Sequence, residues 1–273
     1  MSEFFEHPAV QGGAAPFVVA LIVGLALGRT RYAWLAILAG YLTMVMLSTG
    51  ISFSPLTASR KIVLIAIVAA VAGLVADRVA AKSRLLMWIL VVVAGLAAAW
   101  AFITVLAQRD AGQGWLQGFG LAAFTALMAA AMLSLRNDPL RAGAASVGLG
   151  VAAGIAAVLS AYIGALLAGI AVAVSAGALL LAWVITSRPA APGIFGTLMV
   201  GVMVALFAEG ALMLAQLPWY ALVLMLLVPL AVRLPVKESA PVIVRAFLLT
   251  VYALAAAAIP IAAAWLAARS AVS

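Results

Sequence analysis

The run AGAASVGLGVAAGIAAVLSAYIGALLAGIAVAVSAGALLLAWVIT, from Ala142 to Thr186, contains no charged residue. One helix crosses the hydrocarbon core of a bilayer with about 20 residues. The run is more than twice that length, so it predicts two membrane spans joined by a tight turn near Ser160 to Gly164. Its small residues, in AGAAS, GVAAG and GALLAG, are typical of helices whose backbones pack closely inside a membrane.

The rest of the chain has the same apolar character. Of its 273 residues, 68% are hydrophobic and 8% are charged, whereas a soluble domain carries about a quarter charged residues. The apolar segments are near-continuous, unlike the short alternating strands of a membrane barrel. The composition therefore predicts an all-α integral membrane protein, a polytopic helical bundle that forms a single transmembrane domain over residues 1–273.

Polar loops divide the chain into ten predicted spans. The loops are rich in Gly, Pro, Arg and Asp, as in Arg136-Asn-Asp-Pro-Leu-Arg141. The spans run over about Val10–Leu27 and Tyr32–Leu47, then a third that follows the Ser48–Lys61 segment and ends at Ala76, then Leu85–Leu106 and Trp115–Leu135, then the two halves of the Ala142–Thr186 run, then Ile194–Ala215, Trp219–Val232 and Pro241–Ala268.

The basic residues predict the orientation of this bundle. Cytoplasmic loops of membrane proteins carry an excess of Lys and Arg. With both termini outside, the inner side carries Arg29, Arg31, Arg78, Lys82, Arg84, Arg136, Arg141, Arg188, Arg233, Lys237 and Arg245, and the outer side carries Arg60, Lys61, Arg109 and Arg269. We therefore predict that both termini lie outside. Ten spans also allow two halves of inverted topology, 1–138 and 139–273, although no sequence repeat accompanies them.

Glu209, in MVALFAEGALML (Met203–Leu214), is the acidic residue that lies inside a predicted span. An ionised carboxylate in hydrocarbon is costly, so an intramembrane acid is a candidate functional group. Its span ends on the predicted outer side near Ala215, which places Glu209 at a depth of about 8 Å, since each helical residue rises 1.5 Å.

Arg60 and Lys61 depart from the charge asymmetry and lie on the same outer side. If Ser54 caps a helix that begins at Pro55, both cations lie about 8 Å along it, at the depth of Glu209. We therefore hypothesise that Glu209 pairs with Arg60 or Lys61 in an outward-opening polar pocket, where a proton or a substrate could break the pair. Two alternatives remain open: a pair that only fixes helix packing, or separate charges that reach headgroups and water.

Hydroxyl groups supply further candidates for a pocket. The segment from Ser48 to Ser59 is rich in Ser and Thr, so it either lines a pocket or forms an ordinary outer loop, which its modest length favours. Tyr41, Tyr162 and Tyr252 are placed to line a pocket or to form helix contacts, with no preference between the two.

The residues that usually carry catalysis are scarce. There is no cysteine and one histidine, His7, which excludes disulfides, thiolate metal sites and bis-His haem ligation. Met128 with Met132, and Met199 with Met203, are i, i+4 pairs that are better explained as apolar filler than as copper ligands. We expect no cofactor, no metal and no enzymatic activity.

These observations favour a secondary transporter of a small solute in a bacterial inner membrane. The alternative is a non-catalytic subunit or assembly partner of a larger membrane complex, which the low number of charges inside the spans favours. The net charge of +8 is explained by the loops and by anionic lipid, so the expected partner is the lipid bilayer and not nucleic acid.

Overall fold

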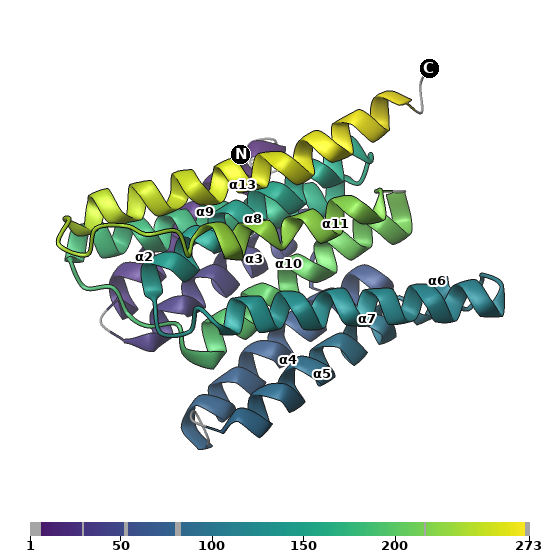
Figure 1. The fold of residues 1–273 in the computed structure, drawn as a ribbon, viewed down its shortest axis with the longest axis horizontal. Coiled ribbons are helices and arrows are strands. Elements are labelled where there is room, and N and C mark those ends of the chain that lie inside the picture. The colour runs from purple at the N-terminus through teal and green to yellow at the C-terminus, as the bar shows by residue number, and fades with distance from the viewer. Residues whose placement is uncertain (1–6, 29, 52–53, 80–82, 216, 271–273) are drawn as a thin grey trace.

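The computed structural model describes residues 7–28, 30–51, 54–79, 83–215 and 217–270, and these residues form a bundle of helices with no strand among them (Figure 1). Arg29 and Lys82 of the charge count lie outside the described residues. The helices are η1 (Val10–Ala14), α2 (Ala15–Leu27), η2 (Arg31–Trp34), α3 (Leu35–Ser48), α4 (Ala58–Val79), α5 (Arg84–Ala101), α6 (Ile103–Leu106), α7 (Ala111–Leu133), α8 (Pro139–Leu159), α9 (Ile163–Thr186), α10 (Gly193–Ala215), α11 (Trp219–Met225), α12 (Leu227–Ala231) and α13 (Val242–Ser270).

Nine helical segments in the described part of the chain are long and apolar enough to cross a membrane. This confirms the polytopic all-α bundle. The ninth predicted span, Trp219–Val232, is a short helical segment: Trp219–Ala231 has 13 residues and is interrupted at Leu226 between α11 and α12. At 1.5 Å per residue it measures about 20 Å, less than the roughly 30 Å hydrocarbon core.

The short segment α11–α12 nevertheless runs from one end of the bundle to the other. It starts directly after the C-terminal end of α10. It ends near Arg233, whose Nη2 donates a hydrogen bond to Ser134 Oγ at the C-terminal end of α7. That end of α7 adjoins the start of α10, because Gly193 N donates to Arg136 O at 3.1 Å. The chain therefore changes ends between α10 and α13, as the prediction of ten spans requires.

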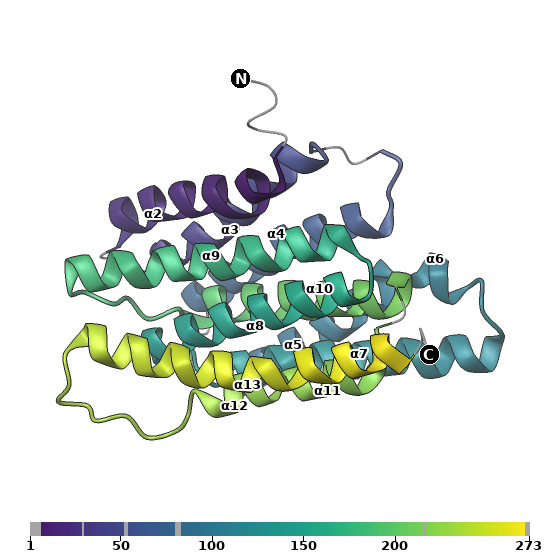
Figure 2. The same ribbon diagram turned by 90° about the horizontal axis from the view of Figure 1, so that it is seen from above.

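Helix α10 lies at the centre of the bundle and packs against α4, α7, α8 and α9 (Figure 2). Nearly all of its residues are buried. The third and eighth predicted spans, α4 and α10, therefore pack directly against each other. Since α2 also packs on α9, helices from the two predicted halves are interleaved. The division into halves of inverted topology and the outer location of both termini stay predictions.

The uncharged run folds as predicted, with a turn at residues 160–162 between α8 and α9. Gly150 and Gly154 of α8 lie against Gly169 of α9 at backbone distance. A Cβ atom added to Gly169 would stand 2.5 Å from Gly154 N and 2.7 Å from Gly150 O. In a membrane such close approach provides much of the attraction between helices, because lipid already surrounds the apolar side chains.

A carboxylate from α4 caps the start of α10. Asp77 Oδ1 accepts a hydrogen bond from Ile194 N at 2.8 Å, and Oδ2 accepts one from Phe195 N at 3.1 Å. The first N–H groups of a helix have no partner within the helix and carry partial positive charge. Gly193 makes this approach possible, since it has φ +64° and a Cβ there would stand 2.5 Å from the carboxylate.

The start of α4 differs from the prediction. The helix begins at Ala58 and not at Pro55, and its first backbone hydrogen bonds include Lys61 N to Thr57 O at 2.9 Å. Arg60 and Lys61 therefore lie in the first turn of α4, not about one and a half turns along it. The predicted match between their depth and that of Glu209 is wrong for this reason, although all three residues do lie toward the same end of the bundle.

We predict that Gly169→Ala lowers the thermal unfolding midpoint of the protein in detergent. The added methyl group must push α8 away from α9, and overpacking of this kind costs about 1–3 kcal/mol. Gly177→Ala is the matched control on α9, because no atom of another helix lies within 4 Å of its Cβ position. Equal midpoints for the two variants would contradict the role assigned to the Gly169 contact.

We also predict that Asp77→Asn destabilises the protein by about 1–2 kcal/mol in the same unfolding measurement. The asparagine loses the negative charge and turns an N–H group toward one of the two backbone donors. Asp110→Asn is the control, because Asp110 precedes α7 and its side chain caps no N–H group. If Asp77→Asn and Asp110→Asn lower the free energy of unfolding equally, the hydrogen bonds between Asp77 and the start of α10 are not the cause of the destabilisation.

Candidate functional site

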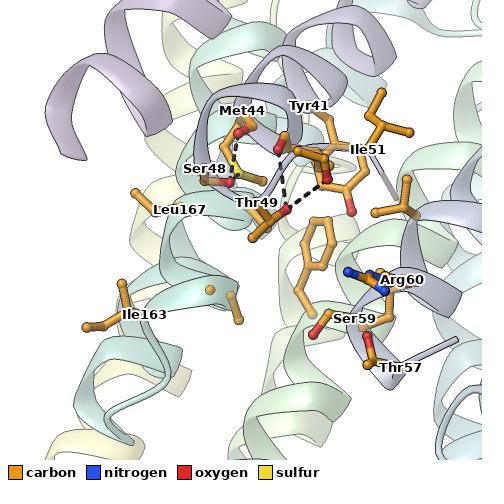
Figure 3. A pocket seen from close by; sticks show the side chains of 18 of the residues that line it. Tyr41, Met44, Ser48, Thr49, Ile51, Thr57, Ser59, Arg60, Ile163 and Leu167 are labelled. Carbon is orange, nitrogen blue, oxygen red and sulfur yellow. Dashed lines mark hydrogen bonds between the residues drawn. The ribbon is translucent and has the colours of Figure 1, made fainter. Parts of the chain in front are cut away.

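A cavity of about 600 Å³ opens at the end of the bundle where α3 ends and α4 and α9 begin (Figure 3). This is the end that the charge count predicts to be outside. The cavity is lined by Gln11 of η1, Tyr41, Met44, Val45 and Ser48 of α3, Thr49, Gly50, Ile51, Pro55 and Thr57 of the connection, Ser59, Arg60, Ile62 and Val63 of α4, Tyr162 of the α8–α9 turn, Ile163, Gly164, Ala165, Leu167 and Ala168 of α9, and Phe207 of α10.

The floor of the cavity is aromatic and buried, whereas its exposed rim combines polar side chains with Ile51 and Ile163. At the floor, Tyr41 and Phe207 are both buried and their rings pack at a centroid distance of 5.3 Å. At the rim, Thr49, Thr57 and Ser59 are exposed. Binding pockets for small molecules commonly combine an apolar lining with a few polar groups that orient the ligand.

The Ser- and Thr-rich segment therefore lines a pocket through its described residues, 48–51 and 54–59, which was the less favoured of its two interpretations; residues 52–53 lie outside the described part of the chain. Part of its hydrogen-bonding capacity is already used: Ser48 Oγ donates to Met44 O at 2.8 Å, and Thr49 Oγ1 donates to Val45 O at 3.3 Å. Ser59 Oγ lies 3.4 Å from Tyr162 Oη and joins α4 to the α8–α9 turn across the rim.

Arg60 is the charged residue among those that line the cavity. Its side chain is partly exposed, and Figure 3 shows it extending from α4 into the pocket beside Thr57 and Ser59. Its Nη1 donates a hydrogen bond to Pro55 O at 2.7 Å. No carboxylate of the described residues belongs to the lining, so none of them neutralises the positive charge of Arg60 there.

Lys61 is adjacent in sequence but has a different environment. Its side chain is buried, its Nζ donates to Trp100 O at 3.2 Å, and the same atom lies 4.8 Å from the centre of the Trp100 ring. The carbonyl group and the ring face together stabilise the buried ammonium group. Lys61 does not line the cavity, and its contacts connect α4 to the end of α5.

Glu209 is fully buried, and it accepts a hydrogen bond from Thr125 Oγ1 of α7 at 2.6 Å through Oε1. Its second carboxyl oxygen, Oε2, is buried without a hydrogen-bond partner. Among the described residues, the ion pair with N and O within 4.0 Å joins Arg141 to Asp138. The predicted pairing of Glu209 with Arg60 or Lys61 is therefore not formed in this structure, and Thr125 takes the place of the cation.

Helix α10 separates Glu209 from the cavity. Phe207 lines the cavity, and residues two apart on an α-helix point about 200° apart. Glu209 accordingly faces α7 on the opposite side of α10. Gly210, the next residue, packs against Tyr162 of the cavity wall, since a Cβ there would stand 3.1 Å from that ring. One helix thus contacts the cavity on one face and holds the buried acid on another.

The sequence pointed to part of this site and missed the rest. Arg60, Tyr41 and Tyr162 were candidates and do line the cavity, whereas Tyr252 does not. Thr125 was missed. The signal for it was a single hydroxyl residue in the apolar stretch Leu121–Leu133, but only the packing of α7 on α10 identifies its partner. The described residues contain no group of three or more His, Asp or Glu side chains arranged to hold a metal ion.

No protein-family model matches this chain, and a search of curated proteins finds none that is similar to it. The fold is that of a membrane-spanning helical bundle with an open cavity at one end.

We predict that Thr125→Val lowers the thermal unfolding midpoint in detergent. Valine has nearly the same shape but no hydroxyl, so both oxygens of the Glu209 carboxyl would be buried without a donor, at a cost of about 1–3 kcal/mol. Thr125→Ser keeps the hydroxyl and should behave much like the wild type. Thr250→Val is the control, since Thr250 bonds only to Ala246 O of its own helix. Similar losses for Thr125→Val and Thr125→Ser would argue against the hydrogen bond as the cause.

Proposed function

We propose that the protein is a secondary carrier that takes up a small solute from the side onto which the cavity opens. The observation that carries this proposal is the cavity of about 600 Å³, with its buried floor and exposed rim. In many carriers the substrate site lies where the two halves of the bundle meet. Here the lining comes from α3 and α4 of the first half and from α9 and α10 of the second.

The chemistry of the lining supports binding over catalysis. It brings together hydroxyl groups, two tyrosines and one arginine on apolar walls. Hydrolytic or transfer chemistry requires a nucleophile with an adjacent base, or paired acidic groups. The lining residues contain no histidine, lysine, aspartate or glutamate to serve as that base. Reversible binding followed by movement of the helices is the simpler use of such a site.

In this proposal Glu209 is the coupling acid. A buried carboxyl group in a membrane bundle is costly unless it has a function or a full set of partners, and its Oε2 has none. Glu209 and the cavity share α10, so a shift of α10 upon binding would change the 2.6 Å bond to Thr125 and the access of water to the acid. Proton binding at Glu209 and solute binding in the cavity would then be linked through one helix.

We predict that Glu209→Gln abolishes solute-dependent proton movement. The protein is reconstituted into vesicles that trap a pH-sensitive dye, and separate additions of small organic acids, amines and sugars are followed by internal pH. Wild-type vesicles should respond to at least one class, and the Glu209→Gln variant should fall to the level of empty vesicles because the glutamine side chain has no ionisable proton to bind and release. Glu238→Gln, in an exposed loop, is the matched control.

Two outcomes would contradict this proposal in different ways. If the Glu209→Gln variant is expressed normally and its flux is unchanged, the proposed coupling role of Glu209 is contradicted, whereas the proposed carrier function is not. A wild-type protein that moves no solute and purifies with a stoichiometric partner would instead favour the alternative, a non-catalytic subunit of a larger membrane complex.

A further inference from the structure

We propose that the cavity binds a small anion with an apolar body, and that Arg60 is the residue that holds its charged group. This inference rests on the proposed function, because it names the class of the solute that the cavity would take. Two observations support it. Arg60 and Lys61, adjacent on α4, differ in burial and in the groups that they contact. The cavity has a buried aromatic floor, formed by Tyr41 and Phe207, below the rim on which Arg60 lies.

The guanidinium group of Arg60 has spare donors that face the cavity. Arginine carries five N–H donors and cannot accept a hydrogen bond. One of these donors goes to Pro55 O at 2.7 Å, which holds the side chain against the rim. Within the described part of the chain, no acidic residue lines the cavity, and the ion pair lies elsewhere, between Arg141 and Asp138. A planar array of donors with an uncompensated charge favours a carboxylate, phosphate or sulfonate.

Lys61, at the same end of α4, is a cation whose contacts serve helix packing, and it provides a comparison for Arg60. Its ammonium group is buried and is stabilised by the carbonyl group and the ring of Trp100. Arg60 lacks both features: it is partly exposed, and its one hydrogen bond leaves most of its donors free. The two residues point about 100° apart on the helix, so one holds α4 against α5 while the other enters the cavity.

The rest of the cavity selects for an apolar body behind the anionic group. Tyr41 and Phe207 form a buried aromatic floor with ring centres 5.3 Å apart, and Met44 and Leu167 extend the apolar wall (Figure 3). An anion held by Arg60 at the rim would place its apolar part over these rings. The volume of about 600 Å³ lies within the range that small-molecule sites occupy, about 300–1,000 Å³. A free amphipathic acid and a lipid headgroup phosphate present the same chemistry to Arg60.

The test compares three probes that share one body: phenylacetate, phenylacetamide and phenethylamine. Each is titrated by calorimetry into the full-length protein in nanodiscs of phosphatidylcholine, without any transport measurement. Phenylacetate should bind at least about tenfold more tightly than the neutral amide, because hydrogen bonds to a charged group are stronger than neutral ones. Phenethylamine should bind most weakly, since its charge matches that of Arg60.

Variants of Arg60 assign this preference to its guanidinium group. Arg60→Gln should remove the advantage of phenylacetate over phenylacetamide, and Arg60→Lys should keep part of it, since lysine retains the charge but not the planar fork. Arg109→Gln makes the same charge change on an exposed residue outside the cavity and should match the wild type. Equal binding of acid and amide to the wild type without any Arg60-dependent retention of an anionic lipid, or an acid preference that survives in Arg60→Gln, would overturn the proposal.

A second arm separates the two sources of the anion. Protein taken from a mixed bilayer is examined by native mass spectrometry for retained phosphatidylglycerol. Retention that depends on Arg60, without phenylacetate binding, supports a headgroup as the anion. Phenylacetate binding without such retention supports a free solute. If phenylacetate binds but the vesicles show no flux, the anion-binding site is supported and the carrier function is contradicted. The two proposals can therefore fail separately.

Discussion

The burial of α10 between four other helices is the constraint on which the rest of this structure depends. Lipid removes most of the hydrophobic drive for helix association, so α10 is held by close packing and by specific polar contacts. Asp77 of α4 caps its first N–H groups at one end, and Glu209 bonds to Thr125 of α7 toward the other. Because α10 is fixed to α4 and α7 in this way, its other face is left to form part of the cavity wall.

The cavity and the buried acid are two aspects of the same central helix. Phe207 contributes to the cavity, Glu209 turns toward α7, and Gly210 packs against Tyr162. A polar group that is buried and incompletely bonded stores free energy that a change of conformation can release. The proposed carrier uses this arrangement, since a solute at one face of α10 and a proton at another would act on a single rigid element.

Much of the fold could be predicted because the bilayer imposes simple rules. The length of the uncharged run 142–186 required two helices, and AGAAS, GVAAG and GALLAG indicated their close contact. The ninth span was predicted as one helix over Trp219–Val232, but it is interrupted at Leu226, a feature for which hydropathy carries no signal. The start of α4 was placed three residues early, because Ser54–Pro55 has the chemistry of a cap without being one.

The sequence by itself determined that this is a polytopic helical membrane protein, and it singled out Glu209, Arg60 and Lys61 as rare charges near one end of it. Only the tertiary structure decided what each of them contacts: Thr125 for Glu209, Trp100 for Lys61, and an open cavity for Arg60. The physical reason is that hydropathy gives the depth of a residue along its helix but not the rotation of that helix. Each residue turns the helix by about 100°, so the partner of a side chain depends on which neighbour packs against that face.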